Sequence, residues 1–261
     1  MSYVLVDAAL SIALLLGVLA CREIGRRLGR RIPADDAVPD EGTAAIQAAV
    51  FGLYGLLVAF TFSDATSRFD DRRELVAREA AVVESVGRLV DVLPLQAQPA
   101  VRAGLRRYVT ARLSAHRAVE DWSTLEGHEA EARDLSRELW RQSVAALRSS
   151  PGADGAQPLL QALNEMAAVS ASRSAALRRH QPLVVFVLLV AFAFASALTS
   201  GYAGAHRGSR RWFHGVLFAT VSALSFFVIL DLEDPRRGLI RVDDADRALT
   251  QALAALEESS R

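Results

Sequence analysis

Histidine and cysteine are the residues best suited to catalysis or metal binding, and their spacing in this chain supports neither. The five histidines are scattered: His116, His128, His180, His206 and His214. The chain has no HExxH, cysteine cluster, nucleophile elbow or GxxxxGK[ST] phosphate loop. Cys21 is the single cysteine, which excludes an intramolecular disulfide. We therefore expect no enzyme, no bound metal ion and no cofactor.

A second group with chemical potential is acidic and follows the last apolar segment. Its six carboxylates could coordinate a hard cation: Asp231, Glu233, Asp234, Asp243, Asp244 and Asp246. They lack the alternating spacing of an EF-hand loop. Acidic residues near helix ends are more often solvated than metal-bound. The sequence thus predicts no metal site here.

Three arginines stand directly after an apolar segment. Arg68, Arg72 and Arg73 follow the run that ends at Phe62. Guanidinium groups at such a place contact anionic lipid headgroups, which is their more common use. They can also attract an anion that leaves a pore. Both interpretations stay open at this stage.

The apolar run before these arginines is rich in small residues. They recur at three- and four-residue steps: Ala45, Ala48, Ala49, Gly52, Gly55 and Ala59. Such spacing lets membrane helices approach closely, which favours tight helix packing. The alternative is a pore-lining face that contains Ala45, Ala49, Gly52 and Leu53. The sequence does not decide between packing and a pore.

Four long apolar segments must position these residues. The chain is 51% hydrophobic and 23% charged, so the two kinds of residue must be separated into blocks. A bilayer core needs about 20 helical residues. Four segments meet this length and predict transmembrane helices: 2–20, 43–62, 182–203 and 212–230. A lipoprotein signal ending at Cys21 is the competing interpretation of the first, but no basic residues precede it.

The segment between the second and third spans reads as helices in water. The second span continues without proline as far as Leu93, with an apolar stripe at Phe69, Val76, Val83, Val86 and Val90. Pro94 ends this helix; further helices follow Pro99, a turn near Gly127, and Pro158. We expect an all-α protein in which 63–181 forms an aqueous antiparallel four-helix bundle, with spans 2 and 3 continuing into it. The tail 231–261 is expected to hold a short helix from Asp246 to Glu258.

The charge balance bears on partners and on orientation. Basic and acidic residues number 30 each, so no nucleic-acid surface is expected. Four spans place both termini and 63–181 on one side of the membrane. Eleven arginines lie near the span ends on that side, against eight on the other. The positive-inside rule therefore favours a cytoplasmic location for the termini and for 63–181.

Several stretches carry a family resemblance. GLYGLLVAFTFSDATSRFDDRRELVAREA, RRYVTARL, NEMAAVSASRSAALRRHQP and LDLEDPRRG resemble a family of uncharacterised bacterial membrane proteins described as bestrophin-like. The resemblance covers nearly the whole chain after the first span. It implies an integral protein of the bacterial inner membrane.

A more distant similarity connects the chain to bestrophins, which are pentameric anion channels whose second span lines a narrow neck. VFGLYGLLVAF is similar to the neck helix and places Ala45, Ala49 and Leu53 where bulkier neck side chains lie. The similarity implies a homo-oligomer, five subunits and small anions as the permeating species. Calcium is not expected, because LIRV interrupts the acidic run before Asp243. The alternative function is a membrane-anchored helical module that docks partners without transport.

Overall fold

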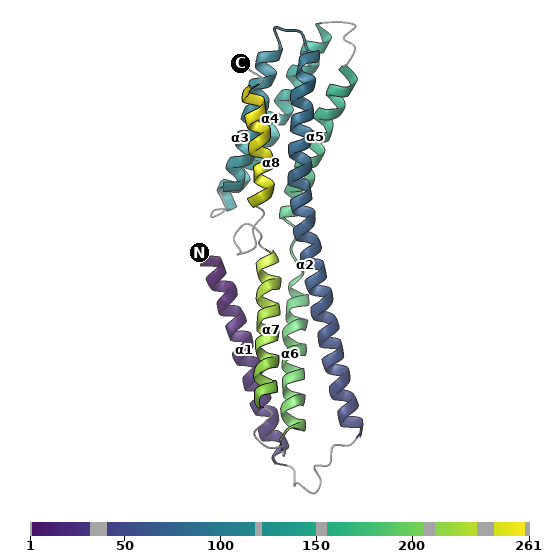
Figure 1. Cartoon of the computed structure of the whole chain (residues 1–261), viewed down its shortest axis with the longest axis vertical. Helices are drawn as coiled ribbons and strands as arrows, with labels where there is room; N and C mark the ends of the chain where they lie inside the picture. Colours follow the sequence, from purple (N-terminus) through teal and green to yellow (C-terminus); the bar gives the residue numbers. More distant parts are fainter. Residues whose placement is uncertain are drawn as a thin grey trace. The chain divides into compact units, whose positions relative to one another are not determined.

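The computed structural model describes residues 2–31, 41–117, 122–149, 156–205, 212–233 and 243–258. Helices are the regular elements of these ranges (Figure 1), which confirms the all-α prediction. They are α1 (Ser2–Gly29), α2 (Glu41–Leu89), the 3-10 turn η1 (Val90–Val92), α3 (Gln98–Arg117), α4 (Trp122–Arg148), α5 (Ala156–Leu177), α6 (Leu183–Ala203), α7 (Trp212–Glu233) and α8 (Asp243–Glu258). In the described ranges, four helices are long and apolar enough to cross a membrane: α1, α2, α6 and α7. The predicted number of spans is thus confirmed.

The chain divides into two compact units. Unit 1 comprises Met1–Arg68 and His180–Ile240, and unit 2 comprises Phe69–Arg179 and Arg241–Arg261. Helix α2 contributes its first part to unit 1 and its second part to unit 2.

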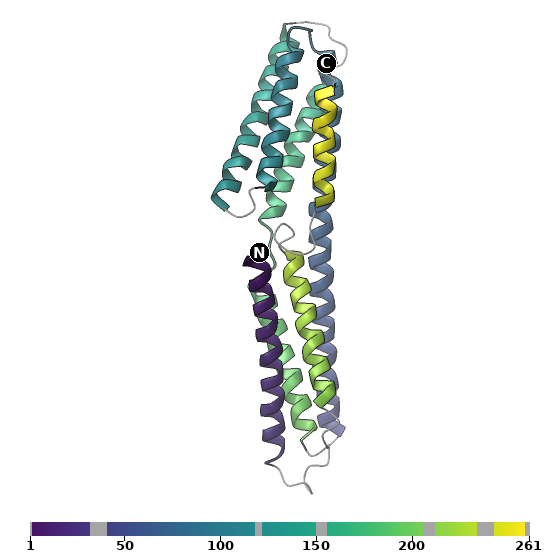
Figure 2. The same cartoon turned by 60° about the vertical axis from the view of Figure 1, so that its left-hand side comes forward.

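In unit 1, α1 packs against α6 and α7 (Figures 1 and 2). The closest approach is between Gly25 of α1 and Gly201 of α6. A Cβ on Gly25 would lie 2.1 Å from the carbonyl oxygen of Leu198, and one on Gly201 would lie 2.0 Å from that of Arg22. Only glycine allows the two backbones to come this close. The tightest small-residue packing in unit 1 is therefore on α1 and α6, where the sequence had not predicted it.

Helix α1 is longer than the predicted span 2–20. It continues to Gly29 through the basic stretch that follows the predicted span. Glu23 pairs with Arg26 and with Arg27 at three- and four-residue spacing, which supports further helical turns. The close contact of Gly25 with α6 holds the same turns in place.

Unit 2 has one hydrophobic core. The predicted stripe of α2 is buried in it, including Val76, Val83 and Val86, as are apolar side chains of α3, α4 and α5. Helix α8 joins them through Leu249, Ala252 and Leu256, and it packs along α3 (Figure 1). The tail helix, expected as a short appendage from Asp246, thus begins at Asp243 and is part of the core.

Two local predictions were wrong. A turn was predicted near Gly127, but Gly127 lies inside α4, which runs as one helix from Trp122 to Arg148. The third span does not continue into the bundle as one helix, because α5 ends at Leu177 and α6 begins at Leu183. Pro182 is the N-cap of α6. Because its ring disfavours a helical conformation at Gln181, the residues before α6 do not extend that helix backwards towards α5.

Candidate functional site

The small-residue face of α2 is uncovered in the single chain. Ala45, Ala49 and Gly52 are exposed, and 53% of Leu53 is exposed. A Cβ added to Gly52 would meet no atom within 4 Å. Close packing at this face would therefore need a partner other than the residues that the structure describes. The structure brings the four predicted residues together on one surface, and their role stays a prediction.

The opposite side of α2 faces its own unit. Tyr54, Thr61 and Ala65 are buried there. Phe218 of α7 makes edge-to-face contacts with Phe51 and Tyr54, at ring-centroid separations of 5.1 and 5.6 Å. These contacts hold α2 on α7 and leave the small-residue face turned away from the unit.

Arg68 lies in a polar cluster at the end of α2 in unit 1. Its side chain is only 17% exposed and pairs with Asp64 and with Glu233 of α7. Its Nη2 also donates to Oε1 of Gln181 at 2.8 Å. The backbone N–H of Gln181 donates to Oε2 of Glu233 at 3.2 Å. Arg68 thus connects α2 to α7 and to the entry of α6.

Arg72 has a different role from the one predicted. It is 5% exposed, and its guanidinium donates to the carbonyl oxygens of Ala176 and Arg179. These carbonyls belong to the C-terminal end of α5, where backbone acceptors lack helical partners. Arg72 therefore caps α5 within unit 2 and is not available to a headgroup or a passing anion. Of the three predicted arginines, Arg73 is the exposed one.

A buried charge network joins the helices of unit 2, and the sequence interpretation missed it. Glu79 of α2 is fully buried and accepts from Arg112 of α3, from Arg173 of α5 and from Tyr108 Oη at 2.6 Å. Arg112 Nη1 also donates to Glu129 of α4 at 2.9 Å. A signal for this network was present, because Glu79 lies three residues after Val76 and four before Val83, on the apolar stripe.

The network keeps its charges in the folded state. Burial by itself raises the pKa of Glu79, but the charges of Arg173 and Arg112, with the hydrogen bond from Tyr108, lower that pKa to about 2. Burial and the charge of Glu79 raise the pKa of Tyr108, so its hydroxyl stays protonated as a donor. Two arginines facing two carboxylates cross-link α2, α3, α4 and α5 without excess charge.

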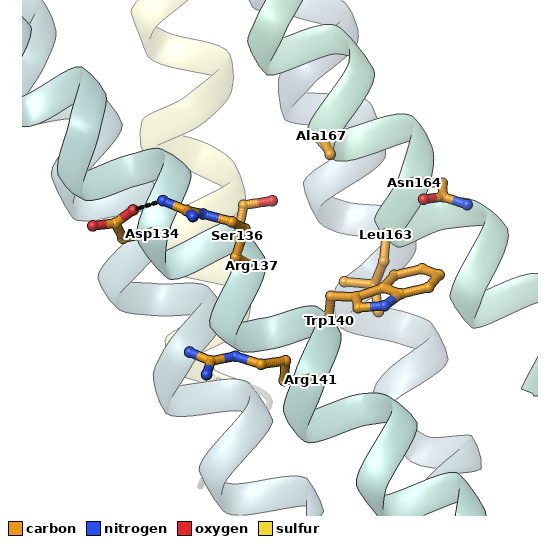
Figure 3. A pocket seen from close by; sticks show the side chains of 8 residues that line it. All are labelled: Asp134, Ser136, Arg137, Trp140, Arg141, Leu163, Asn164 and Ala167. Carbon is orange, nitrogen blue, oxygen red and sulfur yellow. Dashed lines mark hydrogen bonds and ion pairs between the residues drawn. The ribbon is translucent and has the colours of Figure 1, made fainter.

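A surface groove of about 740 Å³ lies between α4 and α5 of unit 2 (Figure 3). Trp140 and Leu163 stand beside each other in it, with Arg137 and Arg141 along α4. Arg137 pairs with Asp134, and Arg141 pairs with Glu138, each on its own helix. The groove has an aromatic wall, but the positive charges of its two arginines are already neutralised by these carboxylates.

The carboxylates considered for a cation are only partly described. Asp234 lies outside the described residues, while Asp231 and Glu233 are buried at the end of α7. Within the described part of the chain, no group of three or more His, Cys, Asp or Glu side chains is placed to hold a metal ion. Glu233, predicted as a solvated helix-end acid, is a partner of Arg68.

The four apolar helices make this chain an integral membrane protein. It belongs to the bestrophin-like family, since the model of the Bestrophin-like domain matches residues 12–246. No curated protein matches the sequence significantly. The family resemblance proposed from the sequence is thus confirmed.

Solved structures with a similar fold carry the bestrophin name. The crystal structure of a bacterial bestrophin homologue from Klebsiella pneumoniae matches with a TM-score of 0.65 at 15% identity, covering 97% of both chains. A variant of that homologue matches with a TM-score of 0.68 at 14% identity, covering 95% of this chain and 97% of the other. At these identities the similarity shows a common fold and nothing about activity.

Proposed function

We propose that the chain is one subunit of an oligomeric membrane channel in which the uncovered face of α2 lines a path for small inorganic ions. The observation that carries this proposal is the contrast between the two sides of α2. Tyr54, Thr61 and Ala65 are buried against the chain's own unit, while Ala49, Gly52 and Leu53 are exposed.

In a symmetric oligomer, the exposed face of α2 would meet the same face of neighbouring subunits. A closed ring of identical subunits brings the same surface of every copy towards one axis. Small side chains allow helices to converge there without filling the space between them. Large apolar side chains such as Leu16 of α1 and Leu224 of α7 are also exposed, and such side chains suit lipid.

The family resemblance adds two expectations. It implies five subunits, and it implies that anions permeate. We place the protein in the bacterial inner membrane, with both termini and 63–181 in the cytoplasm, because the arginines near the span ends favour that side.

Two measurements on one preparation test the proposal. The mass of the protein in mild detergent gives the number of subunits, and liposomes loaded with KCl give the flux of each ion. A ring-sized oligomer with flux above that of empty vesicles supports the channel. An oligomer of any size without flux, in either orientation, contradicts it.

A second candidate is a membrane-anchored module that docks partners through unit 2. The groove lined by the half-buried Trp140 favours it, since aromatic side chains are enriched at protein interfaces. A monomer without flux is the result that this candidate predicts. A conducting oligomer would exclude it as the main function.

A further inference from the structure

The side chain of Arg22, on α1, lies directly against the backbone of α7 in unit 1 (Figure 1). A Cβ added to Gly215 would lie 2.2 Å from Nε and 2.5 Å from Cζ of Arg22, so the guanidinium occupies the place of the missing side chain. On α6, the Cβ position of Gly201 is 2.0 Å from the carbonyl oxygen of Arg22, which fixes the backbone of α1 at the same residue. Arg22 therefore has a definite place between α1 and α7 that glycine at position 215 makes possible.

This place is at the depth of the membrane interface. Trp212 begins α7 and is 62% exposed, and exposed tryptophan marks the level of the lipid headgroups. Gly215 follows three residues later on nearly the same side of α7, about 4.5 Å further along the helix. Val216 and, on α1, Leu16 are exposed apolar side chains deeper in the two spans. The guanidinium of Arg22 thus lies where lipid phosphate meets the acyl chains.

The end of α1 carries more positive charge than its own carboxylate compensates. Residues 22–31 contain five arginines and one acidic residue, Glu23, which pairs with Arg26 and Arg27. The Nε of Arg30 donates to a backbone carbonyl oxygen just beyond α6, which contributes no full negative charge. A positive surface at the end of a membrane helix attracts anionic lipids.

We propose that Arg22 and the surface of α7 at Trp212 and Gly215 bind the headgroup of an anionic phospholipid. The guanidinium donates to the phosphodiester through paired N–H groups, which is the geometry in which arginine binds phosphate best. The acyl chains lie against the exposed apolar side chains of α1 and α7. Basic pockets between membrane helices bind acidic headgroups in this way. The site does not depend on whether the chain conducts ions.

The test is native mass spectrometry of the protein, purified in mild detergent and given equimolar phosphatidylglycerol and phosphatidylcholine with the same acyl chains. The unmodified protein is expected to bind phosphatidylglycerol about fivefold better, the factor that one arginine contributes near an anionic membrane surface. Arg22→Gln should abolish this preference. Arg22→Lys keeps the charge without the paired donors, so it should lower the preference less than Arg22→Gln does.

Two variants separate a defined site from a general attraction. Arg27→Gln removes a charge from the same end of α1, but that side chain is 76% exposed and pairs with Glu23, so the lipid preference should stay. Gly215→Ala keeps every charge and displaces the guanidinium of Arg22, so the preference should fall. Gly127→Ala, in open space on α4, is the control for adding a methyl group. Circular dichroism and the detergent mass show which variants fold, and Gly215→Ala decides the question where Arg22→Gln does not fold.

The outcomes that overturn the lipid site are distinct from those that overturn the channel. Equal binding of the two lipids by the unmodified protein contradicts the site. Equal losses for Arg22→Gln and Arg27→Gln would show a general attraction to the positive end of α1 instead. Displacement of phosphatidylglycerol by inorganic phosphate would show a site for free anions and not for lipid. Ion flux is independent of all three results, so either proposal can fail while the other stands.

Discussion

Replacing Glu79 with glutamine tests whether the buried network holds unit 2 together. Glutamine preserves the shape of the side chain and one acceptor oxygen for Tyr108. It removes the charge that faces Arg112 and Arg173, whose side chains are 1% and 4% exposed. Arg112 would then keep its pair with Glu129, while Arg173 would lose the carboxylate that it pairs with.

The expected loss follows from burial. Removing one partner of a buried ion pair destabilises a protein by about 3–5 kcal/mol, because the remaining charge has no compensation. For a chain of this size, each kcal/mol lowers the unfolding temperature by about 2–4 °C. We therefore expect Glu79→Gln to lower the apparent unfolding temperature by roughly 6–20 °C.

The assay is thermal unfolding in detergent, followed by loss of helical circular dichroism. Glu84→Gln is the matched control, since it removes a carboxylate from the same helix whose pair with Arg88 is 3.8 Å long and exposed. Exposed pairs contribute about 0–1 kcal/mol. Equal shifts for the two variants would refute the argument that the network stabilises unit 2.

Three further predictions follow from particular contacts. The pKa of Glu79 is about 2, against an ordinary 4.5, so its charge stabilises the folded state above pH 4.5 by about 3 kcal/mol, and this stability is lost as the pH falls towards 2. Between pH 4.5 and 2 the unfolding temperature of the unmodified protein should therefore fall more steeply than that of Glu79→Gln. Parallel curves of unfolding temperature against pH for the two proteins would contradict this. Gly201→Ala should lower the unfolding temperature, because its Cβ would lie 2.0 Å from the Arg22 carbonyl oxygen, whereas Gly127→Ala, in open space on α4, should not. Glu233→Gln and Arg68→Gln should each destabilise the protein by about 1–3 kcal/mol, and in a double-mutant cycle the losses should be less than additive; simple additivity would show that the two side chains act separately.

The sequence predicted the elements of this fold better than their contacts. Apolar length and proline positions are local signals, and they located the four membrane helices, the end of α2 near Leu93 and the start of α3 near Pro99. The role of Arg72 was not predictable in this way. Its acceptors are carbonyl oxygens of Ala176 and Arg179, more than 100 positions later in the chain.

The packing of small residues shows the same limit. Both α2 and the pair α1 and α6 carry glycine, and sequence spacing favoured α2. The structure shows the close backbone approach at Gly25 and Gly201, while a Cβ added to Gly52 would meet no atom within 4 Å among the described residues. Small-residue spacing indicates where a helix can approach another, and only tertiary structure shows where it does.

The membrane half of α2 remains the centre of the functional proposal, and thiol modification at Leu53 tests it most directly. In a Cys21→Ser background, Leu53→Cys would be exposed to a charged, membrane-impermeant thiol reagent while ion current is recorded. Leu16→Cys, on an uncovered face of α1 with 59% exposure, is the control that faces lipid. If the uncovered face of α2 lines the path, the reagent blocks most of the current at Leu53→Cys and leaves Leu16→Cys unaffected; a current that is insensitive at Leu53→Cys would show that the ions pass elsewhere.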